Sequence, residues 1–369
     1  MARPGALIKR ISTPPAFYGL SLSLSKERGC LDRSFRDALK SSIGALACMV
    51  AFSACNNNRP VNPPEPVPST SAEKKLAPAP DFNSDSAYAF VNAQVAFGPR
   101  VPNSPAHEKC AAWYVKKLKG YGMEVKVQEG TVTDYANRSL KIKNIMASYN
   151  PQAKTRIVLF SHWDSRAIAD DDSVRKKEPI DGADDGASGC GTMMEVARLL
   201  QKSHPFIGVD LMFLDAEDTG QPSDSPREEH KEDTWCLGTQ YWAKNLPVGY
   251  HPRFGILLDM VGAKNAQFPM EGNSMHYAGD YVKKVWGIAG DLGFSNFFLY
   301  TEDGQITDDH VYVNQFANIP TIDIINYNSI NGGFGSYHHT HADNMKIIDR
   351  NTLKAVGQTL MQVIFSEAP

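Results

Sequence analysis

The chain has 369 residues, of which 42% are hydrophobic and 21% charged, and its formal net charge is −3. This composition is typical of a folded globular protein, and the near-neutral charge does not indicate a nucleic-acid partner. No apolar run reaches the roughly 18 residues that a membrane-spanning helix needs.

Residues 1–55 have the pattern of an export signal. Arg33, Arg36 and Lys40 precede the apolar stretch "SSIGALACMVAFSAC", which ends at Cys55. A basic segment, a short apolar segment and small residues before a cleavage point are typical of secretory signals. "FSAC" resembles a bacterial lipobox, which predicts a lipoprotein of the bacterial envelope, facing the periplasm and lipidated at Cys55. An ordinary secretory signal cut nearby is the alternative.

A tether and a single catalytic domain follow. Residues 56–80 are rich in Pro, Ser and Asn and predict an extended, disordered tether. The folded part is therefore expected over residues 81–369. It contains Cys110, Cys190 and Cys236 without a CxxC pair, which argues against a cysteine-based zinc site. One disulfide is possible in an exported protein, but we expect none.

The predicted elements of this domain alternate between helices and strands. Helical spacing covers residues 84–98 and 103–122, the second with Ser104 as N-cap and Pro105 at the first helical position. The alternating stretches 123–132 and 140–149 predict strands. Short apolar runs predict buried strands at 156–164, 209–218, 254–263 and 319–327, with a helix at 186–202. Such alternation predicts an α/β fold, a three-layer α/β/α sandwich with a mixed, mostly parallel central sheet.

Polar residues gather where these buried strands end. Six stretches carry them: "SHWDS" (161–165), "GADDGASG" (182–189), "DAED" (215–218), "LLDMVGA" (257–263), "TDDHVYV" (307–313) and "YHHTHAD" (337–343). Each stretch alone is equally compatible with a helix cap or a surface histidine. Because sites in parallel sheets lie beyond the carboxyl ends of the strands, six stretches at this edge indicate an active site.

The order of these stretches resembles the zinc aminopeptidase-like fold of family M28, over roughly residues 155–345. Within that fold the chain looks most like the glutaminyl cyclases. The resemblance implies one Zn²⁺ per chain, held by Asp185, Asp218 and His339, with Glu217 as general base and acid. Two carboxylates and an imidazole leave an open coordination position, as catalytic zinc requires.

The metal-ligand residues alone do not distinguish between two branches of this family. Two-zinc aminopeptidases use the residues matching His162 and Asp259 to hold a second metal, and both are present. The cyclases have an aspartate where this chain has Asp308, and the resemblance implies that it shares a hydrogen bond with Asp259 and that both act in catalysis. Two close carboxylates retain one proton between them, which disfavours a second zinc.

The favoured interpretation is a glutaminyl-peptide cyclotransferase, which converts the N-terminal Gln of peptides and proteins to pyroglutamate and releases ammonia. The alternative is a two-zinc aminopeptidase. A binding module with an inactive site is disfavoured, because every expected ligand and the base are present.

The resemblance also implies residues of the substrate pocket. Phe334 matches an aromatic pocket position, and His338 replaces a tryptophan of the animal enzymes. The loop after "DAED" is long and charged, so we expect Trp235 or Trp163 to supply the pocket wall. Ser161 stands where the animal enzymes have a cysteine paired with the position of Cys190. Nothing in the sequence requires a partner subunit, so a monomer is expected.

Overall fold

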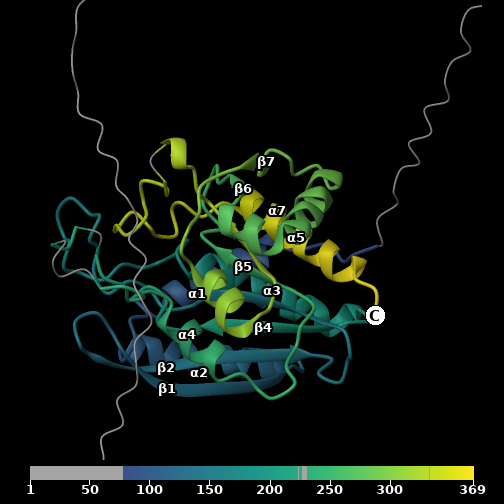
Figure 1. Ribbon diagram of the computed structural model, residues 1–369, viewed down its shortest axis with the longest axis horizontal. Helices are drawn as coiled ribbons and strands as arrows, with labels where there is room; N and C mark the ends of the chain where they lie inside the picture. The colour runs from purple at the N-terminus through teal and green to yellow at the C-terminus, as the bar shows by residue number, and fades with distance from the viewer. Residues whose placement is uncertain (1–77, 223, 227–230, 332) are drawn as a thin grey trace, which may run out of the picture. The chain divides into compact units, whose positions relative to one another are not determined.

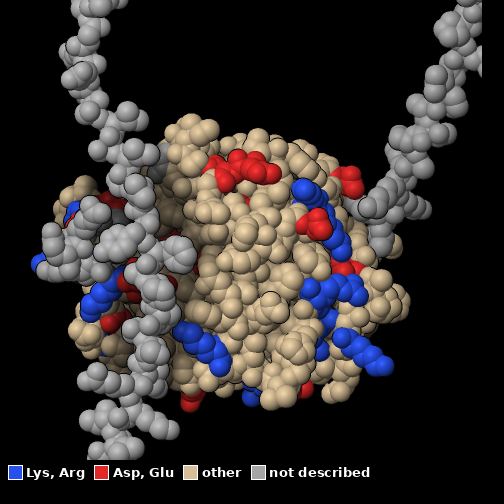
Figure 2. Space-filling view, in the orientation of Figure 1, with Lys and Arg blue, Asp and Glu red and all other residues tan. Residues whose placement is uncertain are grey.

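The structure is a computed structural model that describes residues 78–222, 224–226, 231–331 and 333–369. The predicted signal segment with its lipidation site at Cys55 lies outside the described residues, as does nearly all of the predicted tether. Among the described helices, none is both long and apolar enough to cross a membrane. On the face that Figure 2 shows, acidic and basic side chains are interspersed among uncharged residues.

In the described part of the chain, two helices precede the sheet, and polar side chains define their starts. Helix α1 spans Ser84–Val95, and the Asn83 side chain caps it by accepting the backbone N–H of Ser86. Helix α2 spans Pro105–Gly120, and Ser104 caps it by accepting the N–H of His107. The predicted cap and first residue of the second helix are therefore confirmed.

A six-stranded sheet forms the centre of the fold. Its strands, in the spatial order β1-β2-β4-β3-β5-β8, are β1 (Glu124–Thr133), β2 (Ser139–Tyr149), β4 (Gly208–Leu214), β3 (Arg156–His162), β5 (Gly255–Asp259) and β8 (Thr321–Ile325). The pairings among β4, β3, β5 and β8 are parallel, whereas β1 and β2 are joined antiparallel at one edge. The mixed, mostly parallel sheet is thus confirmed (Figure 1).

Both faces of this sheet are covered, as the alternation of β3 demonstrates. Ile157 and Leu159 enter the main hydrophobic core, whereas Val158 and Phe160 enter a second core that contains Trp242. The covering elements are α3 (Ala187–Ser203), α4 (Leu237–Lys244), α5 (Gly272–Asp291), α6 (Asp309–Tyr312), a π-helical turn (Val313–Ala317) and α7 (Arg350–Ser366). Helices α1, α3 and α7 pack together over the main core, and Trp242 of α4 lies over the second.

Smaller elements lie beyond the central sheet. Strands β6 (Phe268–Met270) and β7 (Phe298–Glu302) pair parallel to each other, and a 3-10 turn covers Ser329–Asn331. In Figure 1 this small sheet is seen near α5, on the side away from β1 and β2.

The carboxyl ends of the parallel strands bring the polar stretches together. Strand β3 ends at His162, β4 at Leu214 and β5 at Asp259. The strands predicted to run to residues 218 and 263 therefore end earlier, and the residues after them form turns. This difference matters for the chemistry, because the acidic residues of "DAED" lie in a turn at the rim of the sheet.

Candidate active site

Three side chains from distant parts of the chain form a compact group of potential metal ligands. Asp185 precedes α3, Asp218 follows β4, and His339 lies between β8 and α7. The His339 Nε2 atom is 3.3 Å from Asp218 Oδ1 and 3.7 Å from Asp185 Oδ2. All three residues are buried, and their potential ligand atoms lie within 4.8 Å of one another.

The bonding of this group leaves room for a cation. Arg166 donates to Asp218 Oδ1 at 3.1 Å, but the buried Oδ2 atom of Asp218 has no hydrogen-bond partner among the residues that the structure describes. A buried carboxylate oxygen without a partner is unfavourable unless a positive group pairs with it. Two carboxylates and one imidazole suit zinc, so the residues fit the metal that the sequence predicted.

The side chains of two further aspartates bind the backbone of the turns that carry the potential metal ligands. Asp343 accepts the backbone N–H groups of Asp184 and Asp185, at 2.7 and 3.1 Å. Asp164 accepts those of Glu217 and Asp218, at 3.1 and 3.2 Å. Carboxylates bonded to consecutive N–H groups restrict a turn to one conformation, so the ligands are positioned before any metal binds.

Several residues at the site adopt a left-handed backbone. Ala216, Met260 and His339 have φ angles of 51°, 49° and 51°. Gly186, just after Asp185, has φ 89°, and a Cβ atom there would lie 2.7 Å from the Asp164 carbonyl oxygen. The turn into α3 therefore requires glycine for both its conformation and its close approach.

A second group of potential ligands adjoins the first. His162 Nε2 is 3.1 Å from Asp185 Oδ1 and 3.2 Å from Asp259 Oδ1. Burial by itself lowers the pKa of His162, but hydrogen bonds to Asp164, Asp185 and Asp259 raise it well above the ordinary value. The two residues that a second metal would need, His162 and Asp259, are therefore close together and hydrogen-bonded to each other.

Glu217 is next to the ligand Asp218 in sequence but has different surroundings. Its Oε1 atom accepts a hydrogen bond from the Cys236 thiol at 3.4 Å, and its Oε2 atom is 3.9 Å from His162 Nδ1. Burial raises the pKa of Glu217 well above its ordinary value; the charge of His162 opposes this, and that of Asp218 reinforces it. A carboxyl group whose pKa is raised in this way is suited to accepting and returning a proton.

Asp308 lies near Glu217 and Asp259, but its hydrogen-bonded neighbour differs from expectation. The hydrogen bond with Asp259 that the resemblance implied is not found among the described residues: Asp308 Oδ1 accepts the backbone N–H of Asp309 at 2.5 Å, and its buried Oδ2 atom has no partner there. Burial is the largest cause of the raised pKa of Asp259, and the charge of Asp308 adds to it. Asp323 of β8 adjoins Asp308, and both of its oxygens are buried without a hydrogen-bond partner among the described residues.

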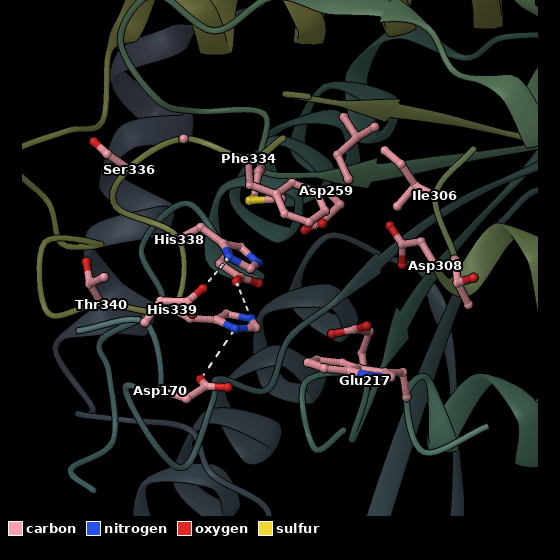
Figure 3. Close-up of a pocket in the computed structure, with 17 residues that line it drawn as sticks. Asp170, Glu217, Asp259, Ile306, Asp308, Phe334, Ser336, His338, His339 and Thr340 are labelled. Carbon is pink, nitrogen blue, oxygen red and sulfur yellow. Dashed lines mark ion pairs between the residues drawn. The ribbon is translucent and has the colours of Figure 1, made fainter. Parts of the chain in front are cut away.

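A pocket of about 460 Å³ opens onto these groups. In Figure 3, Glu217 and Asp308 lie across the pocket from His338 and His339. Phe334 and Trp235, both expected in the pocket, line it. His338 also lines the pocket, stacked between Phe334 and His339 with centroids 4.4 and 3.6 Å away.

The matching family model covers residues 144–364 and is that of peptidase family M28. These residues are more than half of the chain and include every polar stretch described above. The chain belongs to peptidase family M28.

Similarity to individual M28 proteins narrows this assignment. The crystal structure of Tannerella forsythia glutaminyl cyclase is 49% identical with a TM-score of 0.76, over 78% of this chain and 100% of that one. A Zn-dependent exopeptidase from Parabacteroides distasonis has the same identity and TM-score, over 79% and 100%. The glutaminyl-peptide cyclotransferase of Bos taurus is 27% identical over 62% of this chain and 66% of its own length. The resemblance to glutaminyl cyclases is confirmed, and the family and the exopeptidase relative support zinc.

The prediction that Trp163 could supply the pocket wall of this M28 chain is wrong. Trp163, offered as a pocket wall, is fully buried in the main core and stacks on His107 with centroids 4.3 Å apart. His107 in turn bonds Asp215 at 2.9 Å, so the first acid of "DAED" has a structural partner. Cys110, Cys190 and Cys236 are all free.

Four polar residues of the site were not found from the sequence. Asp164, Cys236, Asp323 and Asp343 all bond or adjoin the groups described above. Asp164 and Asp343 do lie inside the quoted polar stretches, which was an available signal. Asp323 interrupts the apolar run "TIDII", and a lone acid in a fully buried strand was a second signal.

Proposed function

We propose that the chain is a zinc-dependent glutaminyl-peptide cyclotransferase acting on the N-terminal Gln of peptides and proteins. The observation that carries the proposal is the position of Glu217: its carboxylate lines a pocket beside a zinc-type ligand group without belonging to that group. The similarity to bacterial and animal glutaminyl cyclases supports the same substrate.

In this proposal Asp185, Asp218 and His339 hold one zinc ion per chain. When bound, the metal supplies a Lewis acid that polarises the side-chain amide carbonyl of the substrate Gln. The unpartnered Oδ2 atom of Asp218 supports its role as a ligand.

The chain's own residues then handle protons and orientation. Glu217 accepts a proton from the α-amine as its nitrogen bonds to the side-chain amide carbon. Glu217 returns that proton as the bond to the amide nitrogen breaks, so ammonia leaves and the five-membered ring remains. Asp259 and Asp308 orient the nitrogen groups, and Phe334 and Trp235 enclose the Gln side chain. Because both reacting groups belong to one molecule, alignment supplies much of the rate.

The second candidate function is a two-zinc aminopeptidase. The group formed by His162, Asp185 and Asp259 supports it, since these residues could hold another metal, and one similar structure is described as an exopeptidase. Against it stands Asp308, whose charge adds to the burial that raises the pKa of Asp259 and so disfavours Asp259 as an ionised ligand.

A peptide assay separates the two functions. We would incubate the zinc-loaded protein with Gln-Ala-Ala, with Ala-Ala-Ala as the control peptide, and analyse the products by mass spectrometry. A product lighter by one ammonia, with Ala-Ala-Ala untouched, is expected for the cyclotransferase. Free Gln and cleavage of the control would establish the aminopeptidase, with His162 and Asp259 as further ligands.

We also propose, from the sequence pattern alone, that the protein is an exported lipoprotein of the bacterial envelope. It would be anchored at Cys55, act as a monomer, and meet exported proteins that expose an N-terminal Gln. Metabolic labelling with a fatty acid tests the anchor: label should be incorporated by the natural chain and lost in Cys55→Ser. Equal labelling of the two chains would disprove the anchor.

A further inference from the structure

Glu217, the proposed proton carrier, has few hydrogen-bond partners although its side chain is only 13% exposed. Within the described residues, the Cys236 thiol is the side chain that donates a hydrogen bond to it, at 3.4 Å from Oε1. The ring nitrogen His162 Nδ1 is 3.9 Å from Oε2, which is beyond hydrogen-bond reach. The orientation of the Glu217 carboxylate therefore depends strongly on one sulfur atom.

Cys236 is fastened to the turn that carries Glu217. Its backbone N–H donates to the Glu217 carbonyl oxygen at 3.0 Å, and the N–H of Leu237 donates to the Ala216 carbonyl oxygen at 3.0 Å. Gly238 packs so closely that a Cβ atom there would lie 1.9 Å from the Asp215 carbonyl oxygen. Cys236 is fully buried with φ 56°. These contacts prevent the thiol from moving independently of the turn.

The surroundings of Cys236 keep its sulfur protonated. Burial raises the pKa of the thiol well above its ordinary value, and the charges of Asp309 and Glu217 raise it further. A thiol that stays neutral is a donor toward the carboxylate rather than a nucleophile.

We propose that Cys236 is a positioning residue for the cyclisation reaction. Its S–H group holds Glu217 Oε1, which leaves Oε2 without a hydrogen bond within the described residues and available for the proton that the substrate gives up. The inference rests on the proposed function of Glu217. Cys236 touches neither substrate nor metal in this proposal and acts only through Glu217.

The kinetic test compares Cys236→Ala, Cys236→Ser and the matched control Cys110→Ala. Cys110 is also a buried thiol, but it lies in α2 and the main core. We expect kcat for Gln-Ala-Ala to fall about tenfold in C236A with KM changed less than about twofold, since one hydrogen bond to a charged group is lost. C236S, which keeps a donor, should recover most of kcat, and C110A should keep it in full.

Three outcomes would overturn the proposal. Full activity of C236A would show that the thiol has no role, and equal losses in C236A and C236S would show that a hydrogen-bond donor at this position does not matter. Loss of zinc from C236A would make Cys236 a metal ligand, which its place beside Glu217 and Asp308 permits geometrically.

A spectroscopic readout distinguishes failure of this inference from failure of the proposed function. The infrared S–H stretching band of Cys236, assigned by its loss in C236A, should move to higher frequency in Glu217→Gln, because a neutral amide accepts more weakly than a carboxylate. If the wild type proves inactive on Gln-Ala-Ala and the band still moves, the contact stands and the cyclase proposal falls. A band unchanged by Glu217→Gln refutes the contact itself.

Discussion

Glu217 and Asp218 are neighbours in sequence, yet their carboxylates meet different groups. Asp218 lies against the cationic Arg166 and beside His339 and Asp185 of the ligand group. Glu217 meets a neutral thiol and the pocket. The left-handed φ of Ala216 turns the chain just before both residues. This turn separates Asp218, the proposed metal ligand, from Glu217, the proposed proton carrier.

Replacing Glu217 by Gln tests this division. The amide keeps the size of the side chain but cannot accept a proton, so we expect kcat to fall at least about a hundredfold. Zinc content, measured by mass spectrometry of the metal, should stay at the wild-type value. An active Glu217→Gln protein would remove Glu217 from the mechanism.

Replacing His339 by Ala tests the ligand group. Removing the imidazole leaves two buried carboxylates facing each other, and we expect the purified variant to contain little zinc and to show no turnover. His341→Ala is the control, because His341 lies in the same segment and bonds Asp172 at 2.7 Å instead. Wild-type zinc content in His339→Ala would contradict its assignment as a ligand.

At the scale of elements, one side chain joins the turn before α3 to the segment before α7. Asp343 accepts the N–H groups of Asp184 and Asp185, and it lies four residues after His339 in the same segment. In Asp343→Asn only one oxygen can accept these bonds, so we expect zinc affinity to fall about tenfold to a hundredfold in a chelator competition. Asp349→Asn, at the cap of α7, should leave affinity unchanged; equal affinity in both variants would refute this linkage.

Helix α5 begins at a carboxylate whose contribution depends on pH. Burial alone would raise the pKa of Glu271, but hydrogen bonds from His310 and from the N–H groups of Asn273 and Ser274 hold it at about 2, below the ordinary 4.5. The stabilisation is therefore present above pH 4.5 and is lost as the pH falls toward 2. It corresponds to about 3 kcal/mol at neutral pH, at about 1.4 kcal/mol per pKa unit.

Glu271→Gln should accordingly lower the free energy of unfolding by about 2–3 kcal/mol at pH 7 and by less at pH 3. Urea denaturation at the two pH values measures this difference, and the exposed Glu302→Gln serves as control. A loss that does not change with pH would mean that the charge of Glu271 is not what stabilises the helix start.

A structural feature could be predicted from the sequence where the residues that determine it lie close together along the chain. The strands and the second helix followed from alternation, from apolar runs and from the Ser104–Pro105 start, all of which are short-range patterns. Asp185, Asp218 and His339 were named because the resemblance to the glutaminyl cyclases implied them, motif by motif. The Cys236–Glu217 and Asp308–Asp323 contacts were not foreseen, because they depend on how turns and strands pack in three dimensions.

At the scale of the molecule, the ligand group connects three segments far apart along the chain. A cation bound to Asp185, Asp218 and His339 binds the folded chain and not the unfolded one, so it stabilises the fold. We expect chelation to lower the melting temperature by about 5–10 °C and one equivalent of zinc to restore both stability and activity. A requirement for two equivalents would instead support the two-zinc enzyme.

The left-handed backbone of Ala216, Met260 and His339 has a consequence for laboratory evolution. Each such residue is strained by about 1 kcal/mol or more, and glycine would relieve that strain. Glycine at position 216 would also let the turn sample many more conformations and would loosen the hold on Glu217. A library of variants screened for heat resistance alone should therefore accumulate Ala216→Gly, and the selected variants should have a lower kcat. A screen for turnover should instead keep the strained alanine.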